Sequence, residues 1–107
     1  MSDTLARIQA LARNGEICIS EHGYDELVED GLSAREVLDG LWEAILVEDY
    51  PNYHKGSCVL VLQRDLTGLP IHVVWGIPRG RATPAVLITA YRPAPERWTD
   101  DWMRRKS

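Results

Sequence analysis

The 107-residue sequence contains no run of about 18 apolar residues, so no membrane-spanning helix is expected. Its first residues carry charges throughout and lack the apolar stretch of a signal peptide. Only two cysteines are present, Cys18 and Cys58, which are too few for a disulfide framework. Together these absences favour a single cytoplasmic domain over residues 1–107, in which both cysteines remain reduced thiols.

The sequence also lacks the motifs of several kinds of catalytic site. No C-x-x-C or H-x-x-x-H spacing occurs, so neither a metal site nor a cofactor is predicted. There is no nucleophile elbow, and no glycine-rich phosphate loop is followed by a helix. Any chemistry at this domain is therefore expected to be independent of metal.

Basic residues are scarce in the first half of the chain. Residues 1–54 carry three basic and twelve acidic side chains, whereas residues 55–107 carry nine basic and four acidic ones. The overall charge of −4 hides this asymmetry. Two interpretations remain open, because charges on separate faces act separately on partners. The charges either solubilise the surface, or a basic face in the second half meets a polyanion or an acidic protein.

The spacing of apolar residues changes from helical to strand-like near residue 44. Helical spacing covers residues 4–14, 21–29 and 33–42. The third helix begins with a capping box, Ser33 to Glu36. Strands are predicted at residues 44–50, 57–64, 71–77 and 85–91, and residues 17–19 form a short strand or an extended link. Helices followed by closely connected strands predict an α+β domain, with N-terminal helices packed on one face of a four-stranded antiparallel sheet.

The last two predicted strands form a hairpin around Gly80 and Arg81. A symmetric register pairs Ile71 with Tyr91, Val73 with Thr89 and Trp75 with Leu87. Because strand side chains alternate, the other face holds His72, Val74, Val86, Ile88 and Ala90. This second set is aliphatic apart from the histidine, so it is predicted to face the helices. The face with Trp75, Thr89 and Tyr91 is then the open surface.

Two further predictions concern the tryptophans. Trp42 follows Leu38 and Leu41 at helical spacing and is expected to be buried against the sheet. Trp98 and Trp102 are four residues apart, so a last helical turn would bury at least one of their rings. Residues 104–106 are predicted to form a frayed basic tail.

Five short motifs occur in an order known from one family. They are SEHG at 20–23, GLS at 31–33, EDYP at 48–51, LPIHVV at 69–74 and ITAYRP at 88–93. Over residues 17–98 the chain resembles the small bacterial family of domains of unknown function numbered 4258. That family is similar in layout to RelE-type and BrnT-type toxins, which are small α+β ribonucleases paired with antitoxins. The resemblance implies a RelE-like fold and, more remotely, RNA-binding or residual ribonuclease-toxin character.

Cleavage of the RelE type needs cations that hold phosphate and a group that transfers a proton. The candidate RNA-binding residues are Arg79, Arg81 and Arg92, and the candidate catalytic residues are His22 and Tyr91. Glu26 and Asp30 stand where members of the family often have arginines, so we expect weak RNA binding and little cleavage. The alternative function is a non-enzymatic interaction module that binds an antitoxin-like protein or a second copy of itself as a homodimer.

Overall fold

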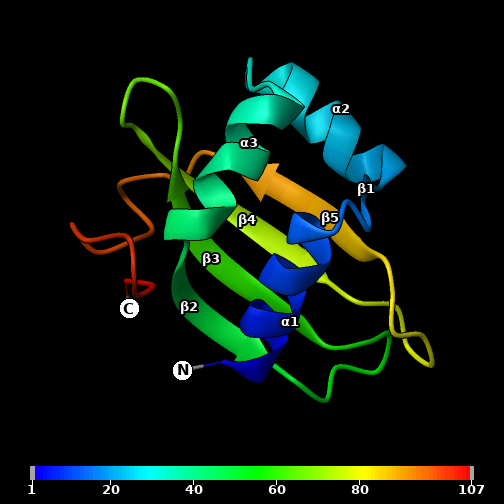
Figure 1. The fold of residues 1–107 in the computed structure, drawn as a ribbon. Coiled ribbons are helices and arrows are strands. Elements are labelled where there is room, and N and C mark those ends of the chain that lie inside the picture. The colour runs from blue at the N-terminus through cyan, green and yellow to red at the C-terminus, as the bar shows by residue number, and fades with distance from the viewer. Residues whose placement is uncertain (1, 107) are drawn as a thin grey trace.

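The computed structural model describes residues 2–106. They form an α+β domain, as predicted, in which the strands make one sheet of order β1-β5-β4-β3-β2 (Figure 1). The helices are α1 (Asp3–Arg13), α2 (Glu21–Glu29), α3 (Ala34–Gly40) and the short 3-10 helix η1 (Leu41–Glu43). The strands are β1 (Ile17–Ile19), β2 (Ile45–Tyr50), β3 (Cys58–Arg64), β4 (Pro70–Gly76) and β5 (Ala85–Tyr91).

The predicted sheet of four antiparallel strands is wrong in one respect. β1 pairs in parallel with the first residues of β5, from Ile17 opposite Ala85 to Ile19 opposite Leu87, so the sheet is mixed and has five strands. The other neighbours pair antiparallel, as expected. Three residues carry too little periodicity to distinguish a strand from a link, and their partner lies more than sixty residues away. The pattern of neighbouring residues therefore could not predict the pairing of β1 with β5.

The helix starts follow the local capping chemistry. Ser20 Oγ accepts from the backbone N–H of Gly23 at 3.0 Å, and the Ser33–Glu36 capping box is present with both of its hydrogen bonds. The first helix begins one residue earlier than predicted, because Ser2 provides its cap. These caps satisfy N–H groups that have no partner within the helix.

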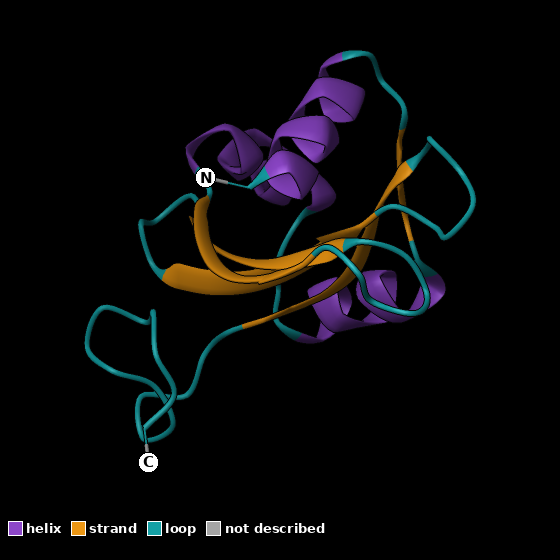
Figure 2. Ribbon diagram, turned by 90° about the horizontal axis from the view of Figure 1, so that it is seen from below, coloured by secondary structure: helices purple, strands orange, loops and turns teal. Residues whose placement is uncertain are grey.

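The helices cover the sheet unequally. α1 and α3 lie over one face of the sheet, and α2 lies against β5 at the β1 edge (Figures 1 and 2). The core fills the space under the helices with buried side chains of both layers, including Ile8, Leu27, Val37, Leu41, Val59, Val61, Ile71, Val73, Trp75 and Leu87. None of the described helices is long and apolar enough to cross a membrane.

The hairpin register differs from the prediction because β5 contains a bulge. Trp75 pairs with Leu87 as predicted, but His72 pairs with Tyr91 and Val73 with Ala90. The register shifts by one residue between Val74 and Trp75. The bulge moves Thr89 and Tyr91 to the face of Val74 and His72, with which they pair, and it leaves the alternation of β4 unchanged.

The assignment of the two faces of β4 is also wrong, because the more aliphatic face is not the one that the helices cover. Ile71, Val73 and Trp75 were predicted to lie on the open face, but all three are fully buried on the helix-covered face. Trp75 Nε1 donates to Gln63 Oε1 at 2.9 Å, and Gln63 donates in turn to the carbonyl oxygen of Val37. Val74 and Ile88 line the opposite face instead. Because Gln63 accepts a hydrogen bond from the indole N–H, Trp75 can be buried in the core without an unsatisfied donor.

The tryptophan and tail predictions are corrected in part. Trp98 is buried, as predicted for one ring of the pair, but no helical turn holds it, because Trp98 and Arg105 form an isolated β-bridge. Trp42 is 46% exposed and lies under the guanidinium of Arg13, so its predicted burial is wrong. The tail is fixed rather than frayed: Arg105 forms an ion pair with Glu48 at 3.1 Å and stacks on Trp98.

Candidate functional site

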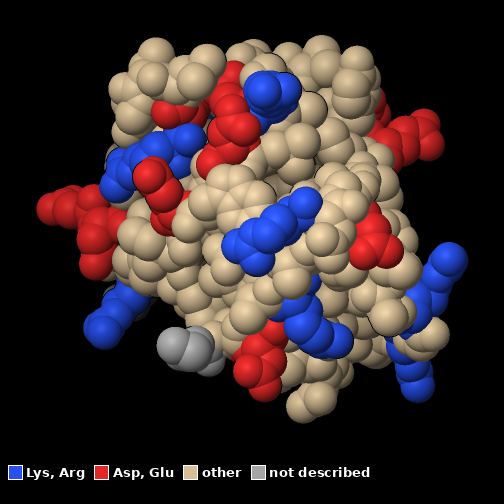
Figure 3. All heavy atoms as spheres, in the orientation of Figure 1, with Lys and Arg blue, Asp and Glu red and all other residues tan. Residues whose placement is uncertain are grey.

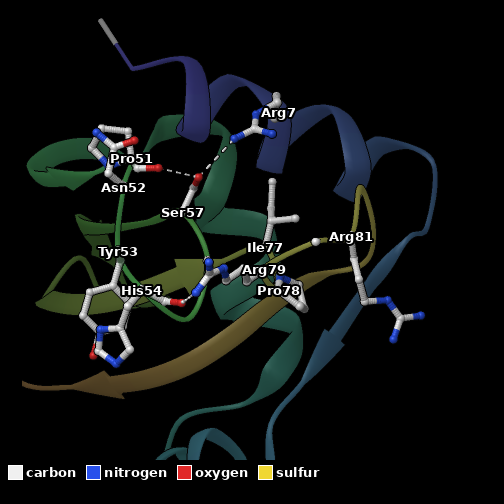
Figure 4. Close-up of a pocket in the computed structure, with 12 residues that line it drawn as sticks. Arg7, Pro51, Asn52, Tyr53, His54, Ser57, Ile77, Pro78, Arg79 and Arg81 are labelled. Carbon is white, nitrogen blue, oxygen red and sulfur yellow. Dashed lines mark hydrogen bonds between the residues drawn. The ribbon is translucent and has the colours of Figure 1, made fainter.

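A surface hollow of about 550 Å³ lies where α1 meets the β2–β3 and β4–β5 loops (Figure 4). We call it the basic hollow. Its lining residues are Arg7, Pro51, Asn52, Tyr53, His54, Gly56, Ser57, Ile77, Pro78, Arg79, Gly80 and Arg81. Three arginines and a histidine are among them, and none of them is an aspartate or glutamate. The hollow is therefore a region of positive potential on an acidic protein.

Two of the arginines donate hydrogen bonds to the loop between β2 and β3. Arg7 Nη2 donates to Ser57 Oγ at 3.4 Å, and Arg79 Nη1 donates to the carbonyl oxygen of His54 at 3.3 Å. Figure 4 shows Arg81 pointing outward from the hollow, so it contributes charge at the rim. Both hydrogen bonds are long, and both acceptors are uncharged oxygens. Each bond uses one of the five N–H donors of a guanidinium group, so most of the donors remain free.

The loops that carry these residues are held together by backbone hydrogen bonds. Ile77 N–H donates to the Ser57 carbonyl oxygen at 2.9 Å, and Arg79 N–H donates to that of Lys55 at 3.0 Å. Gly56 sits between them with φ of +127°, and a Cβ there would overlap the carbonyl oxygen of Ile77. Only glycine permits this approach. The two loops therefore hold Arg79 beside His54.

The arginines of the basic hollow differ from three other arginines of the chain in having no ion pair. Within residues 2–106, Arg7, Arg79 and Arg81 have no carboxylate within 4.0 Å, whereas Arg35, Arg92 and Arg105 each have one. Figure 3 shows that charges of both signs are scattered over the face that α1 and α3 cover. Arg13, Arg64, Arg97 and Arg104 likewise form no ion pair among the described residues, so the hollow is distinguished by gathering three unpaired arginines at one place.

The structure places Arg92 away from the other two predicted RNA-binding residues. It lies just after β5, and its Nη1 donates to Asp65 Oδ2 at 2.9 Å. Hydrogen bonds to Asp65 from the Thr67 hydroxyl, the Leu69 N–H and Arg92 lower the pKa of this carboxyl to about 2. Arg92 therefore binds the turn between β3 and β4, and the carboxylate of Asp65 neutralises part of its charge.

Tyr91 lies in a cluster with a buried histidine. His72 Nε2 lies 2.8 Å from the carbonyl oxygen of Trp102, which can only accept, so this nitrogen carries the proton. Nδ1 then accepts from the Tyr91 hydroxyl at 3.2 Å. Burial lowers the pKa of His72 and raises that of Tyr91, so both remain neutral near pH 7. His72 is therefore buried beneath the C-terminal segment, through Trp98 and Trp102, rather than beneath the helices as predicted.

His22 lies on the surface of α2, and its side chain is 70% exposed. Its Nε2 lies 3.0 Å from Glu26 Oε1, to which Thr89 also donates a hydrogen bond. His22 and Tyr91 are absent from the lining of the basic hollow, which contains Arg79 and Arg81. The predicted catalytic and RNA-binding residues are therefore not gathered at one place.

Sequence reasoning missed several residues that the fold brings to the hollow. Arg7 comes from α1, and its position there depends on how that helix crosses the sheet. Tyr53 and His54 come from the loop between β2 and β3, which carries no motif in the sequence. Their rings are adjacent, with centroids 4.5 Å apart. No group of three or more His, Cys, Asp or Glu side chains in the described part of the chain could hold a metal ion.

Comparison with known proteins identifies the family but no closer relative. The search of curated proteins and the search of solved structures both found no match. The family model described as "Domain of unknown function (DUF4258)" matches residues 19–92, which is more than half of the chain. This range contains β2 to β5 and the last residue of β1, together with both loops of the basic hollow and all five predicted site residues. Arg7 and Arg105 lie outside it. The chain therefore belongs to the DUF4258 family.

Proposed function

We propose that this domain binds RNA through the basic hollow and does not cleave it through His22 or Tyr91. The observation that carries the proposal is the set of three arginines, Arg7, Arg79 and Arg81, that surround one hollow without a carboxylate partner. Such groups are available to phosphate without first breaking an ion pair. In this proposal the family's layout reflects an ancestry shared with RelE-type and BrnT-type toxins.

Phosphate recognition fits the donors that the hollow presents. A guanidinium has five N–H donors in a planar fork, and phosphate oxygens accept them in pairs. Arg7 and Arg79 each use a donor in a long hydrogen bond to a neutral oxygen, which holds the side chain in place. The remaining donors are free for the ligand. Binding would release counterions from the RNA and would therefore weaken as the salt concentration rises.

Cleavage requires a proton-transfer group within hydrogen-bond reach of the scissile phosphate. Neither predicted catalytic residue meets this condition beside the basic hollow. The Tyr91 hydroxyl donates to His72, and its raised pKa opposes formation of the phenolate. His22 faces Glu26 on a helix whose charged residues are all acidic. Of the three histidines, His54 is the one that lines the hollow, so it is the residue to test for any residual cleavage.

One observation favours a second candidate function, a protein-interaction module. Tyr24 and Val28 lie one turn apart on α2 and are 59% and 62% exposed, beside the acidic residues of the same helix. An exposed apolar pair with an acidic border would suit a basic partner such as an antitoxin-like protein. This surface is separate from the basic hollow, so the two functions can be tested independently.

The first experiment measures retention of a mixed RNA pool by purified protein at about 50 mM and about 200 mM salt. The variant Arg7→Gln/Arg79→Gln/Arg81→Gln should lose most binding, and the slope of log affinity against log salt should fall by about 2 for three lost phosphate contacts. The matched control is Arg35→Gln/Arg64→Gln/Arg97→Gln, which removes the same charge away from the hollow. Equal losses in both variants would leave only a net-charge effect and contradict the proposal.

Cleavage is scored in the same samples, together with growth of cells that express the protein. We expect intact RNA and unimpaired growth. RNA cutting that His22→Ala or Tyr91→Phe abolishes would show that the predicted catalytic residues act, and it would overturn the second half of the proposal.

A further inference from the structure

The open face of the sheet continues the basic hollow as a groove. Two further hollows, of about 300 Å³ and about 430 Å³, lie on this face. Tyr53 lines both of them and the basic hollow, and Ile88 lines both of the new ones. The three hollows therefore adjoin one another, in an order that leads from Arg79 past Tyr53 and Ile88 to Arg105. We call the part beyond Tyr53 the aromatic groove.

The aromatic groove has an apolar floor and tyrosines along its length. Its floor is formed by side chains of β3, β4 and β5, namely Cys58, Leu60, Val74, Val86 and Ile88. Three tyrosines line it, Tyr50, Tyr53 and Tyr91. Tyr50 and Tyr53 are 45% and 46% exposed, so their rings remain available to a ligand. Gly76 keeps the floor low, because a Cβ there would lie 2.8 Å from Ile88 Cδ1.

Hydrogen bonds hold two of these tyrosines in fixed orientations. The Tyr50 hydroxyl donates to Glu48 Oε1 at 2.8 Å, and the Tyr91 hydroxyl donates to His72. Glu48 is the single carboxylate among the residues that line the aromatic groove, and Arg105 neutralises it at 3.1 Å. Lys55 lines the near end of the groove and Arg105 the far end. A ligand along the groove thus meets positive charge at the near end, π-faces along its length and a neutral ion pair at the far end.

We propose that the RNA recognised by this domain is single-stranded, with its phosphates at the basic hollow and its unpaired bases on Tyr53 and Tyr50 in the aromatic groove. This inference rests on the proposed function and adds the form of RNA and the residues that contact its bases. Unpaired bases can stack on aromatic rings, whereas the bases of a duplex are already stacked on each other. A duplex would reach the arginines but could not enter the groove.

The test compares binding of a fluorescent ten-residue uridine oligonucleotide and a ten-base-pair RNA duplex at low salt. Wild-type protein should bind the single strand at least about tenfold more tightly. Tyr53→Ala and Tyr50→Ala should each weaken single-strand binding at least about fivefold, as expected for a lost stacking contact. Tyr50→Ala, which lies outside the basic hollow, should leave duplex binding unchanged. The matched control is Tyr24→Ala, which removes an exposed tyrosine from α2. Thermal unfolding of each variant confirms that it is folded.

The outcomes separate this inference from the function on which it rests. Both RNAs could bind equally well, with binding unchanged in the tyrosine variants and lost in the arginine variant. That result would overturn the single-strand inference, whereas the proposal of RNA binding at the basic hollow would stand. No retention of either RNA at low salt would overturn both. If the protein forms a dimer in solution and Ile88→Glu dissociates it, a second copy occupies the groove, which would also overturn the inference. The control is Ile45→Glu, at an exposed residue outside the groove.

Discussion

The two ends of the β4–β5 hairpin carry arginines in opposite electrostatic situations. At the loop end, Arg79 and Arg81 join Arg7 around the basic hollow with no acidic partner among the described residues. At the other end, Arg92 is paired with Asp65 and Arg105 with Glu48. A count of basic residues treats these ends alike. The comparison shows that availability of charge, rather than its amount, distinguishes a binding surface from a structural contact.

The largest expected effect comes from breaking the loop end. Gly56→Ala would force a Cβ against the carbonyl oxygen of Ile77 at a φ that disfavours other residues, so we expect a loss of about 3 kcal/mol in unfolding free energy. The control is Gly80→Ala in the same hollow. Gly80 also has a positive φ, but a Cβ there meets nothing within 4 Å, so a loss of about 1 kcal/mol is expected. Urea denaturation measures both, and equal losses would contradict the close approach of the two loops.

A smaller effect is expected from protonation at the tail end. Burial lowers the pKa of His72 below its ordinary value of 6.5. The unfolded chain therefore takes up a proton near pH 6.5 while the folded chain resists it. Stability should be fully present above pH 6.5 and should decrease as the pH falls toward the lower folded pKa. Urea midpoints between pH 8 and pH 5 measure this dependence.

The variant His72→Gln keeps a donor for the Trp102 carbonyl and removes the titration. Its stability should depend less on pH over the same range than that of the wild type. A His54→Gln control shows whether removal of a surface histidine at the other end has the same consequence. A wild-type profile that is flat between pH 8 and pH 5 would contradict the burial of neutral His72.

The smallest expected effect comes from freeing an arginine at the far end of the hairpin, so that both ends carry an unpaired cation. Asp65→Asn removes the partner of Arg92 and should raise RNA affinity by less than about threefold, because one freed surface cation adds little at a distance from the hollow. Fluorescence anisotropy at low salt measures the change. The control Asp101→Asn changes the charge equally at a carboxylate that bonds Thr99 rather than an arginine. A tenfold gain in the first variant would place Arg92 within the binding surface.

Much of the fold could be predicted from the sequence where the signal is local. The boundaries of α2 and β5 and the capping box at Ser33 agree with the structure, because each depends on residues that are near one another in the chain. The prediction failed where a single residue altered the register. The bulge in β5 leaves Ile88 between two paired residues and moves Thr89 and Tyr91 to the face opposite Trp75. The burial of Trp75 itself depends on which face of the sheet the helices cover.

The candidate site was predicted less completely. Arg79 and Arg81 were identified because they sit in one short loop whose basic character is visible in the sequence. Arg7, Tyr53 and the aromatic groove were not identified, because they depend on where a helix crosses the sheet and which face the helices leave uncovered. Glu48 and Arg105 are 57 residues apart, and their ion pair fixes a tail that had been expected to fray.

The sequence by itself determined the elements, their order, the family and the excess of positive charge in the second half of the chain. These properties depend on composition and on interactions within a few residues. Only the tertiary structure decided which arginines pair with carboxylates, which face of the sheet is open and which side chains share a hollow. The reason is physical: an ion pair, a bulge and a groove are each created by contacts between distant segments, and their energies depend on distances that local patterns do not contain.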